Sequence, residues 1–85
     1  MQIIIKRLFI QVDLSRSELH QELLKIFGRT EGFAITLPQK VPKTSMDYYC
    51  YVIIEDVDNI DFILNNIIQD VQQIPDFLDF VWKEI

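Results

Sequence analysis

Three aromatic side chains have the type and spacing that best fit a binding surface. Tyr49 and Tyr51 alternate within the uncharged run 48–54, and Phe9 lies in another apolar segment near the N-terminus. Alternate residues of a β-strand project from the same face of a sheet. Aromatic rings exposed on such a face stack on bases or pack against another protein. We therefore expect Phe9, Tyr49, Tyr51 and Ile53 to form a partner-binding face.

The charge of the chain is unevenly distributed along the sequence. Residues 1–43 carry seven basic and four acidic side chains, whereas residues 44–85 carry nine acidic side chains and only Lys83 as a base. The net charge of −5 disfavours general binding to nucleic acid, which depends on neutralising phosphates. A basic protein partner is favoured instead. We expect Asp56, Asp58 and Asp61 to contribute to its binding surface.

Patterns typical of catalytic, metal or phosphate sites are missing from the sequence. The acidic segment 55–61 lacks the spacing of a calcium-binding loop. His20 has no second histidine or nearby cysteine with which to form a zinc site. The connection 13–16 has no glycine, which excludes the phosphate-binding loop of an acylphosphatase-type enzyme. We therefore predict no enzyme activity, no catalytic residue, no metal and no cofactor.

Length and composition predict one small intracellular domain over residues 1–85. The apolar content of 49% favours a compact fold over disorder. The single cysteine, Cys50, excludes an internal disulfide and is expected in the core. No apolar run reaches the length needed to cross a bilayer, and the N-terminus lacks the pattern of a signal peptide. A cytoplasmic location follows as the expectation.

Hydrophobic periodicity predicts four strands and two helices. The first helix has a capping box at Ser15 and Glu18, an apolar stripe and a C-terminal Gly28. The second begins near Asp58, with Asp61 in its first turn and Val57 and Phe62 as a hydrophobic staple. The final segment 77–85 fits a strand or a helix, and its aromatic content favours the strand. The predicted strands are 2–12, 32–37, 47–55 and 77–85, with a loop at 38–45.

The first strand contains a conflict in its alternation. Leu8, Ile10 and Val12 share one face, whereas Ile3 and Ile5 have the opposite parity. A β-bulge near residues 6–7 would place both groups on the same face.

The order β-α-β-β-α-β is typical of the ferredoxin-like split β-α-β plait. In this α+β fold, a four-stranded antiparallel sheet is covered by two helices on one face. The other face is left open to solvent or a partner. The three aromatic residues are predicted to lie on that open face, with Cys50 turned towards the helices.

Two segments resemble the RNA-recognition motif. Residues 8–14 (LFIQVDL) are similar to its first-strand hexapeptide, and residues 49–52 (YCYV) are similar to the centre of its third-strand octapeptide. The basic residue that begins the octapeptide is replaced by Asp47. The resemblance implies that Phe9, Tyr49 and Tyr51 stack bases of single-stranded RNA. The nucleic-acid-binding residues would then be Arg7, Phe9, Lys40, Lys43, Tyr49 and Tyr51.

Residues 48–85 also resemble the effector domain of leucine-responsive-type regulators. The shared features are a hydrophobic strand ending in an acid, a helix, an Ile-Pro turn and a strand ending in Lys-Glu-Ile. That resemblance implies a dimer that senses a small ligand.

These observations predict a small, acidic, non-enzymatic protein-binding module. It would self-associate as a homodimer or bind a basic protein, as inhibitor and immunity proteins do. An RNA-recognition-type binder of single-stranded RNA is the alternative. A dimeric small-ligand-sensing domain is the third possibility, and no membrane partner is expected.

Overall fold

The computed structural model describes residues 2–44 and 46–84. Its elements follow the predicted order, with one added strand. They are β1 (Ile3–Val12), α1 (Arg16–Phe27), β2 (Phe33–Ile35), β3 (Gln39–Lys40), β4 (Asp47–Glu55), α2 (Ile60–Val71) and β5 (Phe77–Glu84). Among the described residues, no helix is long and apolar enough to cross a membrane.

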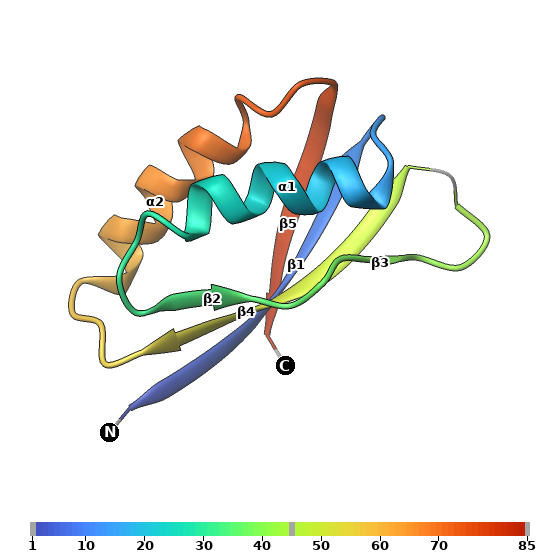
Figure 1. Cartoon of the computed structure of the whole chain (residues 1–85). Helices are drawn as coiled ribbons and strands as arrows, with labels where there is room; N and C mark the ends of the chain where they lie inside the picture. The colour runs from blue at the N-terminus through green and yellow to red at the C-terminus, as the bar shows by residue number, and fades with distance from the viewer. Residues whose placement is uncertain (1, 45, 85) are drawn as a thin grey trace.

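The strands form one antiparallel sheet in the order β2-β4-β1-β5, with β3 also paired to β4. Both helices cover the same face of this sheet (Figure 1). The predicted α+β ferredoxin-like arrangement and the strand at the C-terminus are therefore confirmed. The prediction of four strands is corrected to five, because Gln39 and Lys40 pair with Tyr49 and Tyr48 in a segment predicted as loop.

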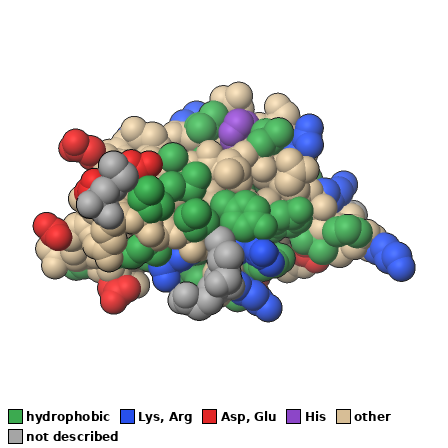
Figure 2. Space-filling model, turned by 90° about the horizontal axis from the view of Figure 1, so that it is seen from below, with side chains coloured by type: hydrophobic (Ala, Val, Ile, Leu, Met, Phe, Trp, Pro, Cys, Tyr) green, Lys and Arg blue, Asp and Glu red, His purple; other side chains and the backbone are tan. Residues whose placement is uncertain are grey.

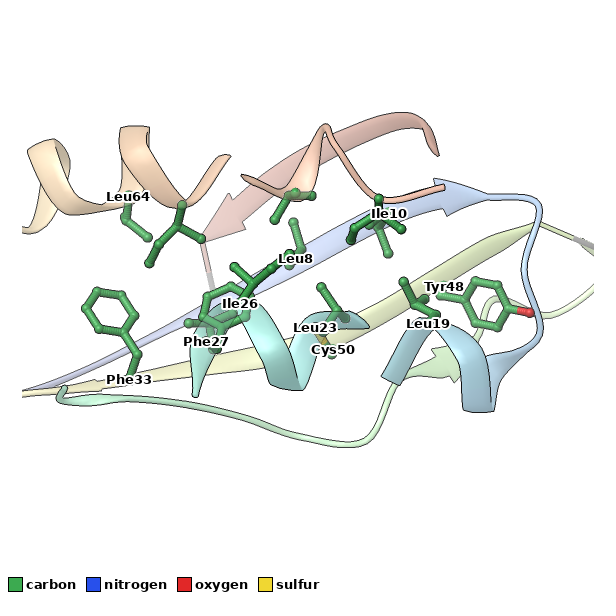
Figure 3. Packing of buried hydrophobic residues seen from close by; sticks show 14 of the residues in the cluster. Leu8, Ile10, Leu19, Leu23, Ile26, Phe27, Phe33, Tyr48, Cys50 and Leu64 are labelled. Carbon is green, nitrogen blue, oxygen red and sulfur yellow. The ribbon is translucent and has the colours of Figure 1, made fainter. Parts of the chain in front are cut away.

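The core lies between the helices and the facing side chains of β1 and β4 (Figure 3). Tyr48, Cys50, Val52 and Ile54 of β4 are each at most 3% exposed, which confirms the predicted parity of this strand. The Tyr48 hydroxyl donates a hydrogen bond to the Leu14 carbonyl oxygen at 2.7 Å. The core therefore accommodates a tyrosine because its one polar atom has a partner.

The first helix begins as predicted. The backbone N–H of Glu18 donates to Ser15 Oγ at 3.2 Å, and the Ser15 N–H donates to Glu18 Oε1 at 3.3 Å. These reciprocal bonds satisfy donors that a helix N-terminus otherwise leaves free. Gly28 follows the last helical residue with a right-handed φ of −66°. The end of α1 therefore does not require the left-handed conformation for which glycine is favoured.

The second helix differs from its prediction at the N-terminus. It begins at Ile60, and Asn59 precedes it with a left-handed φ of 57° and no side-chain capping bond. Asparagine tolerates this conformation better than most residues. Phe62 is 67% exposed, so the predicted staple with Val57 does not form. The chain reaches α2 by a left-handed turn rather than by a capping motif.

The predicted bulge in β1 is also wrong. Pairing with β4 continues without interruption from Ile3 opposite Glu55 to Gln11 opposite Asp47. The irregularity lies instead between Gln11 and Val12 in the pairing with β5. Ile3 and Ile5 therefore remain on the face away from the helices, where they are 52% and 46% exposed. Leu78 lies at the irregular pairing and is 53% exposed.

Candidate functional site

The face of the sheet away from the helices, here called the open face, carries three rows of side chains across β4, β1 and β5. Each row is set by the strand register. The rows, written from β4 to β5, are Tyr51, Arg7 and Lys83 (the basic row); Tyr49, Phe9 and Val81 (the aromatic row); and Asp47, Gln11 and Asp79 (the acidic row). Figure 2 shows hydrophobic side chains gathered on this face, with basic side chains among them.

The predicted aromatic trio lies together on the open face. The ring centroids of Phe9 and Tyr49 are 6.0 Å apart, and those of Tyr49 and Tyr51 are 6.2 Å apart and nearly perpendicular at 87°. These separations are typical of interacting aromatic pairs. The Tyr51 N–H also donates to Thr36 Oγ1 at 2.9 Å, which holds this part of β4 beyond the end of β2. The rings therefore have a defined arrangement on a rigid support.

Arg7 and Lys83 lie over these rings. The Arg7 guanidinium carbon is 5.3 Å from the Tyr51 centroid and 5.9 Å from the Phe9 centroid. The Lys83 ammonium nitrogen is 5.7 Å from the Phe9 centroid. Cations at such distances are attracted to the faces of aromatic rings. The Arg7 Nε atom is nevertheless buried without a hydrogen-bond partner among the described residues.

The two cations face each other, and neither has an acidic partner among the described residues. Arg7 and Lys83 are directly paired across β1 and β5. Within the described part of the chain, neither forms an ion pair. Like charges opposite each other on a sheet destabilise the pairing. The basic row is therefore a local concentration of positive charge on a face of an otherwise acidic protein.

A groove runs along the aromatic row. It consists of two adjoining hollows of about 360 and 230 Å³, which share Phe9 and Val41. The smaller hollow reaches Arg7, Tyr49 and Tyr51, and the larger one reaches the acidic row. We call the two hollows together the open-face groove. The volume of the larger hollow falls in the lower part of the range for small-molecule sites, and that of the smaller hollow is below it.

The wall formed by Val41 is held by hydrogen bonds of the β3–β4 loop. The Val41 N–H donates to the Asp47 carbonyl oxygen at 2.9 Å. The Thr44 hydroxyl donates to the Val41 carbonyl oxygen at 2.7 Å. Asp79, at the far end of the groove, accepts the Phe80 N–H at its Oδ1 atom at 2.8 Å. The groove thus has a basic end, an aromatic floor and an acidic end.

The other predicted site residues are not brought to this groove. Asp56, Asp58 and Asp61 follow the end of β4 that lies opposite the acidic row. That end, at Glu55, is roughly 20 Å from Tyr49 at about 3.3 Å per strand residue. Asp56 Oδ1 accepts the Gln2 N–H at 2.7 Å, so this side chain holds the start of β1. The predicted partner-binding residues therefore lie in two separate regions, the open face and the acidic segment that follows β4.

Two of the predicted nucleic-acid-binding cations are also placed elsewhere. Lys40 pairs in register with Tyr48, whose side chain faces the helices, and lines a hollow beside Ser15 and Arg16. Lys43 is exposed in the loop with a left-handed φ of 66°. Only Arg7 of the predicted cations lies on the open face. The predicted basic strip of Arg7, Lys40 and Lys43 does not form.

Sequence reasoning missed Lys83, which lies over the Phe9 ring, and Val41, which lines the groove. The alternation of segment 77–85 places Lys83 on the same face as Val81, but alternation does not reveal which residue lies opposite. The register with β1 pairs Lys83 with Arg7. Val41 lies in a loop between two prolines and carries no sequence pattern that predicts a wall. Strand pairing was the missing information for the first residue and loop conformation for the second.

A larger hollow, of about 670 Å³, lies on the helix side. Its charged side chains pair with one another: Lys25 with Glu22 at 3.5 Å, and Arg29 with Asp70 at 3.8 Å. This hollow therefore offers no unpaired charge of one sign to a ligand. The open-face groove is smaller, but its basic row is unpaired within the described residues.

Cys50 is not positioned for nucleophilic chemistry. It is 1% exposed, and burial raises the pKa of its thiol to about 12. A thiol with this pKa stays protonated near neutral pH and is a poor nucleophile. The described residues also contain no group of three His, Cys, Asp or Glu side chains that could hold a metal ion.

Comparisons with known proteins show a likeness in structure but none in sequence. No family model and no curated protein sequence matches the chain. Among solved structures, the fold is similar to that of a mutant form of SnoaB from Streptomyces nogalater, a cofactor-independent oxygenase. The TM-score is 0.66 at 12% sequence identity, covering 98% of this chain and 90% of SnoaB. At this identity, the likeness shows a shared fold.

The likeness overturns the functional prediction made from the sequence. The chain was expected to be non-enzymatic because it carries no catalytic motif. Nearly all of its architecture is found in an oxygenase described as cofactor-independent, so the lack of a cofactor or metal motif is not an argument against catalysis. The prediction of a non-enzymatic function is therefore corrected. This applies to the protein-binding module and to its two alternatives, the RNA binder and the ligand-sensing domain.

Proposed function

We propose that this chain is a small-molecule enzyme that binds a planar aromatic substrate in the open-face groove. Its proposed reaction class is cofactor-independent oxygenation. The observation that carries this proposal is the groove itself, with Phe9, Tyr49 and Tyr51 on one side and Val41 on the other. The likeness of the whole fold to SnoaB supports the reaction class.

The shape and composition of the groove favour a flat, apolar ligand. Its centre is lined by rings and aliphatic side chains, including Val41 and Val81. A planar aromatic molecule gains both apolar burial and ring–ring contact in such a site. A flexible polar ligand would gain neither. The charged rows at the two ends provide the few polar groups that fix orientation in small-molecule sites.

Binding is tested with naphthamide, an uncharged planar probe, followed by two-dimensional amide NMR. We expect the largest shifts at residues 7–11 and 47–51, with smaller effects on α1. Phe9→Ala should weaken binding at least about fivefold, because stacking on an aromatic side chain is worth about 1–3 kcal/mol. Leu24→Ala is the matched control, since Leu24 is 43% exposed on α1.

The control separates loss of the groove from loss of any exposed apolar side chain. Equal weakening by Phe9→Ala and Leu24→Ala would contradict a site in the groove. If no amide signal shifts at the highest soluble concentration of naphthamide, the proposed binding function is overturned.

Catalysis is tested by oxygen uptake with a panel of hydroxynaphthalenes and chelator-treated protein. We expect uptake above the uncatalysed rate for at least one compound, with hydroxylated or quinone product identified by mass spectrometry. Phe9→Ala should reduce this rate, and Leu24→Ala should leave it unchanged. Uptake at the uncatalysed rate throughout the panel would overturn oxygenation of this compound class, while the binding result would stand separately.

A further inference from the structure

We infer that the ligand of the open-face groove carries a carboxylate, which binds between Arg7 and Lys83. This inference rests on the proposed function and names the charge and orientation of the small molecule. The aromatic part of the ligand lies along Phe9 and Tyr49, and the carboxylate lies at the basic row.

The first support is the pairing of like charges. Arg7 and Lys83 are opposite each other on neighbouring strands, and no acidic side chain in the described ranges forms an ion pair with either. The acids of the open face are two rows away from the basic row: Asp47 and Asp79 lie beyond the aromatic row, and Glu55 lies on the other side, beyond the pair of Ile5 and Ile53. An anion bound at the basic row would convert a repulsive pair into two attractive contacts.

The second support is a hydrogen-bond donor of Arg7 that has no acceptor in the described part of the chain. The Nε–H of Arg7 is buried and has no acceptor among the described residues, although its guanidinium lines the smaller hollow. A buried donor without an acceptor is unfavourable. A ligand oxygen would supply that acceptor once the guanidinium turns towards the hollow, because Nε itself is not exposed in the ligand-free protein. The orientation of Arg7 over Tyr51 and Phe9, at 5.3 and 5.9 Å, holds its planar group against the floor on which a ring would stack.

The chemistry of these donors favours a carboxylate attached to a flat ring system. Guanidinium matches the planar geometry of a carboxylate, and lysine adds a point charge. The acidic row disfavours a second negative group at the other end of the groove, because Asp47 and Asp79 line that end. A planar aromatic monocarboxylate is therefore the ligand class that satisfies both ends.

The test compares naphthoate with naphthamide, which has the same ring system but no charge at neutral pH. Calorimetry at low salt should show naphthoate binding about tenfold more tightly, as expected for hydrogen bonds to a charged group. Added salt should weaken naphthoate binding and leave naphthamide binding nearly unchanged. Arg7→Met should reduce the preference to less than about threefold.

Arg29→Met is the matched control, because it removes the same charge on the helix side, where Arg29 pairs with Asp70. It should preserve the tenfold preference. Lys83→Met should reduce the preference for naphthoate partly. If Arg7→Met does not fold, Lys83→Met takes its place in the test, and an amide NMR spectrum shows whether Lys83→Met is folded.

Equal affinities for the two probes would overturn the inference while leaving the proposed binding function intact. Binding of neither probe would instead overturn the proposed function. Light scattering on the same samples tests the other possible occupant, a second copy of the chain. A stable dimer whose basic-row amides do not respond to naphthoate would overturn the inference, because a second copy would then cover the site.

Discussion

The two faces of β4 differ in how their polar atoms are satisfied. On the helix side, Tyr48 is 3% exposed and its hydroxyl is bonded to Leu14. On the open side, Tyr49 and Tyr51 are only half-buried, and the Arg7 Nε beside them has no partner in the described structure. On the helix side, the Nε1 of Trp82, which packs against the core, is the one buried side-chain atom without a hydrogen-bond partner among the described residues. The open side has unpaired groups that a ligand can satisfy.

This difference separates residues that support folding from residues that support binding. Neighbouring positions in one strand have opposite roles because successive side chains point to opposite faces. Leu8 and Phe9 of β1 form such a pair, as do Tyr48 and Tyr49 of β4. Substitution of adjacent residues therefore tests the comparison with little change in the surrounding backbone.

The largest expected effect is the loss of stability in Leu8→Ala. Leu8 is fully buried, and truncating a buried leucine costs about 2–5 kcal/mol. Phe9→Ala should cost about 1 kcal/mol, because the ring is only half-buried. Urea unfolding measures both. If Leu8→Ala does not fold, Ile10→Val should cost about 0.5–1.5 kcal/mol, and the matched Ile5→Val should cost less, because Ile5 is 46% exposed on the open face and Ile10 is 2% exposed. Equal costs on the two faces would contradict the comparison.

The next effect is the pH dependence contributed by Cys50. Burial raises the pKa of its thiol to about 12, from an ordinary value of 9.0. The unfolded chain therefore loses this proton first, and stability should decrease as the pH rises above that ordinary value. The slope approaches about 1.4 kcal/mol per pH unit. Unfolding measured against pH in the wild type and in Cys50→Ala isolates this contribution.

Thiol labelling gives a second measurement of the same burial. A reagent should modify Cys50 quickly in urea and slowly in the folded protein, even in mildly alkaline solution. Fast labelling of the folded protein would show that the helix side is less closed than the structure indicates.

A smaller effect is expected from removing the Tyr48 hydroxyl. Tyr48→Phe breaks the 2.7 Å bond to the Leu14 carbonyl and should cost about 1 kcal/mol. Tyr49→Phe should be nearly neutral for stability, because no hydrogen bond of its hydroxyl is present within the described residues. Thermal unfolding of both variants compares the same chemical change on the two faces. A larger loss of stability in Tyr49→Phe than in Tyr48→Phe would contradict the assignment of Tyr48 to the core and of Tyr49 to the binding face.

The smallest effect is a gain of stability in Lys83→Met. Removing one member of the Arg7–Lys83 pair should stabilise the ligand-free protein by a few tenths of a kcal/mol at low salt. The gain should disappear at high salt, where the repulsion is screened. A loss of stability at low salt would indicate that Lys83 has a structural role.

The sequence predicted the helix-covered face better than the open face. Alternation identified Cys50, Val52 and Ile54 as core, and the capping box at Ser15 located the start of α1. These features depend on local sequence, which determines periodicity and capping. The start of α2 was missed because Asn59 enters it through a backbone conformation rather than a capping bond.

The groove depends on strand pairing and on a loop, which local patterns do not specify. Phe9, Tyr49 and Tyr51 were predicted on one face, but their proximity to Lys83 required the register between β1 and β5. The expected bulge led to the prediction that Ile3 and Ile5 share a face with Leu8 and Ile10, whereas they lie on the open face. Apolar residues on an open face have the same pattern as core residues, because sequence alternation does not state what covers each face.

The position of bound naphthoate tests the central claim most directly. Intermolecular NMR contacts should connect the naphthoate ring with the Val41 methyl groups and the Phe9 ring, with its carboxylate towards Arg7. They should be missing for Leu24 and Ile26, which line the larger helix-side hollow. Contacts with Leu24 and Ile26 in place of Val41 and Phe9 would contradict the assignment of the open-face groove as the ligand site.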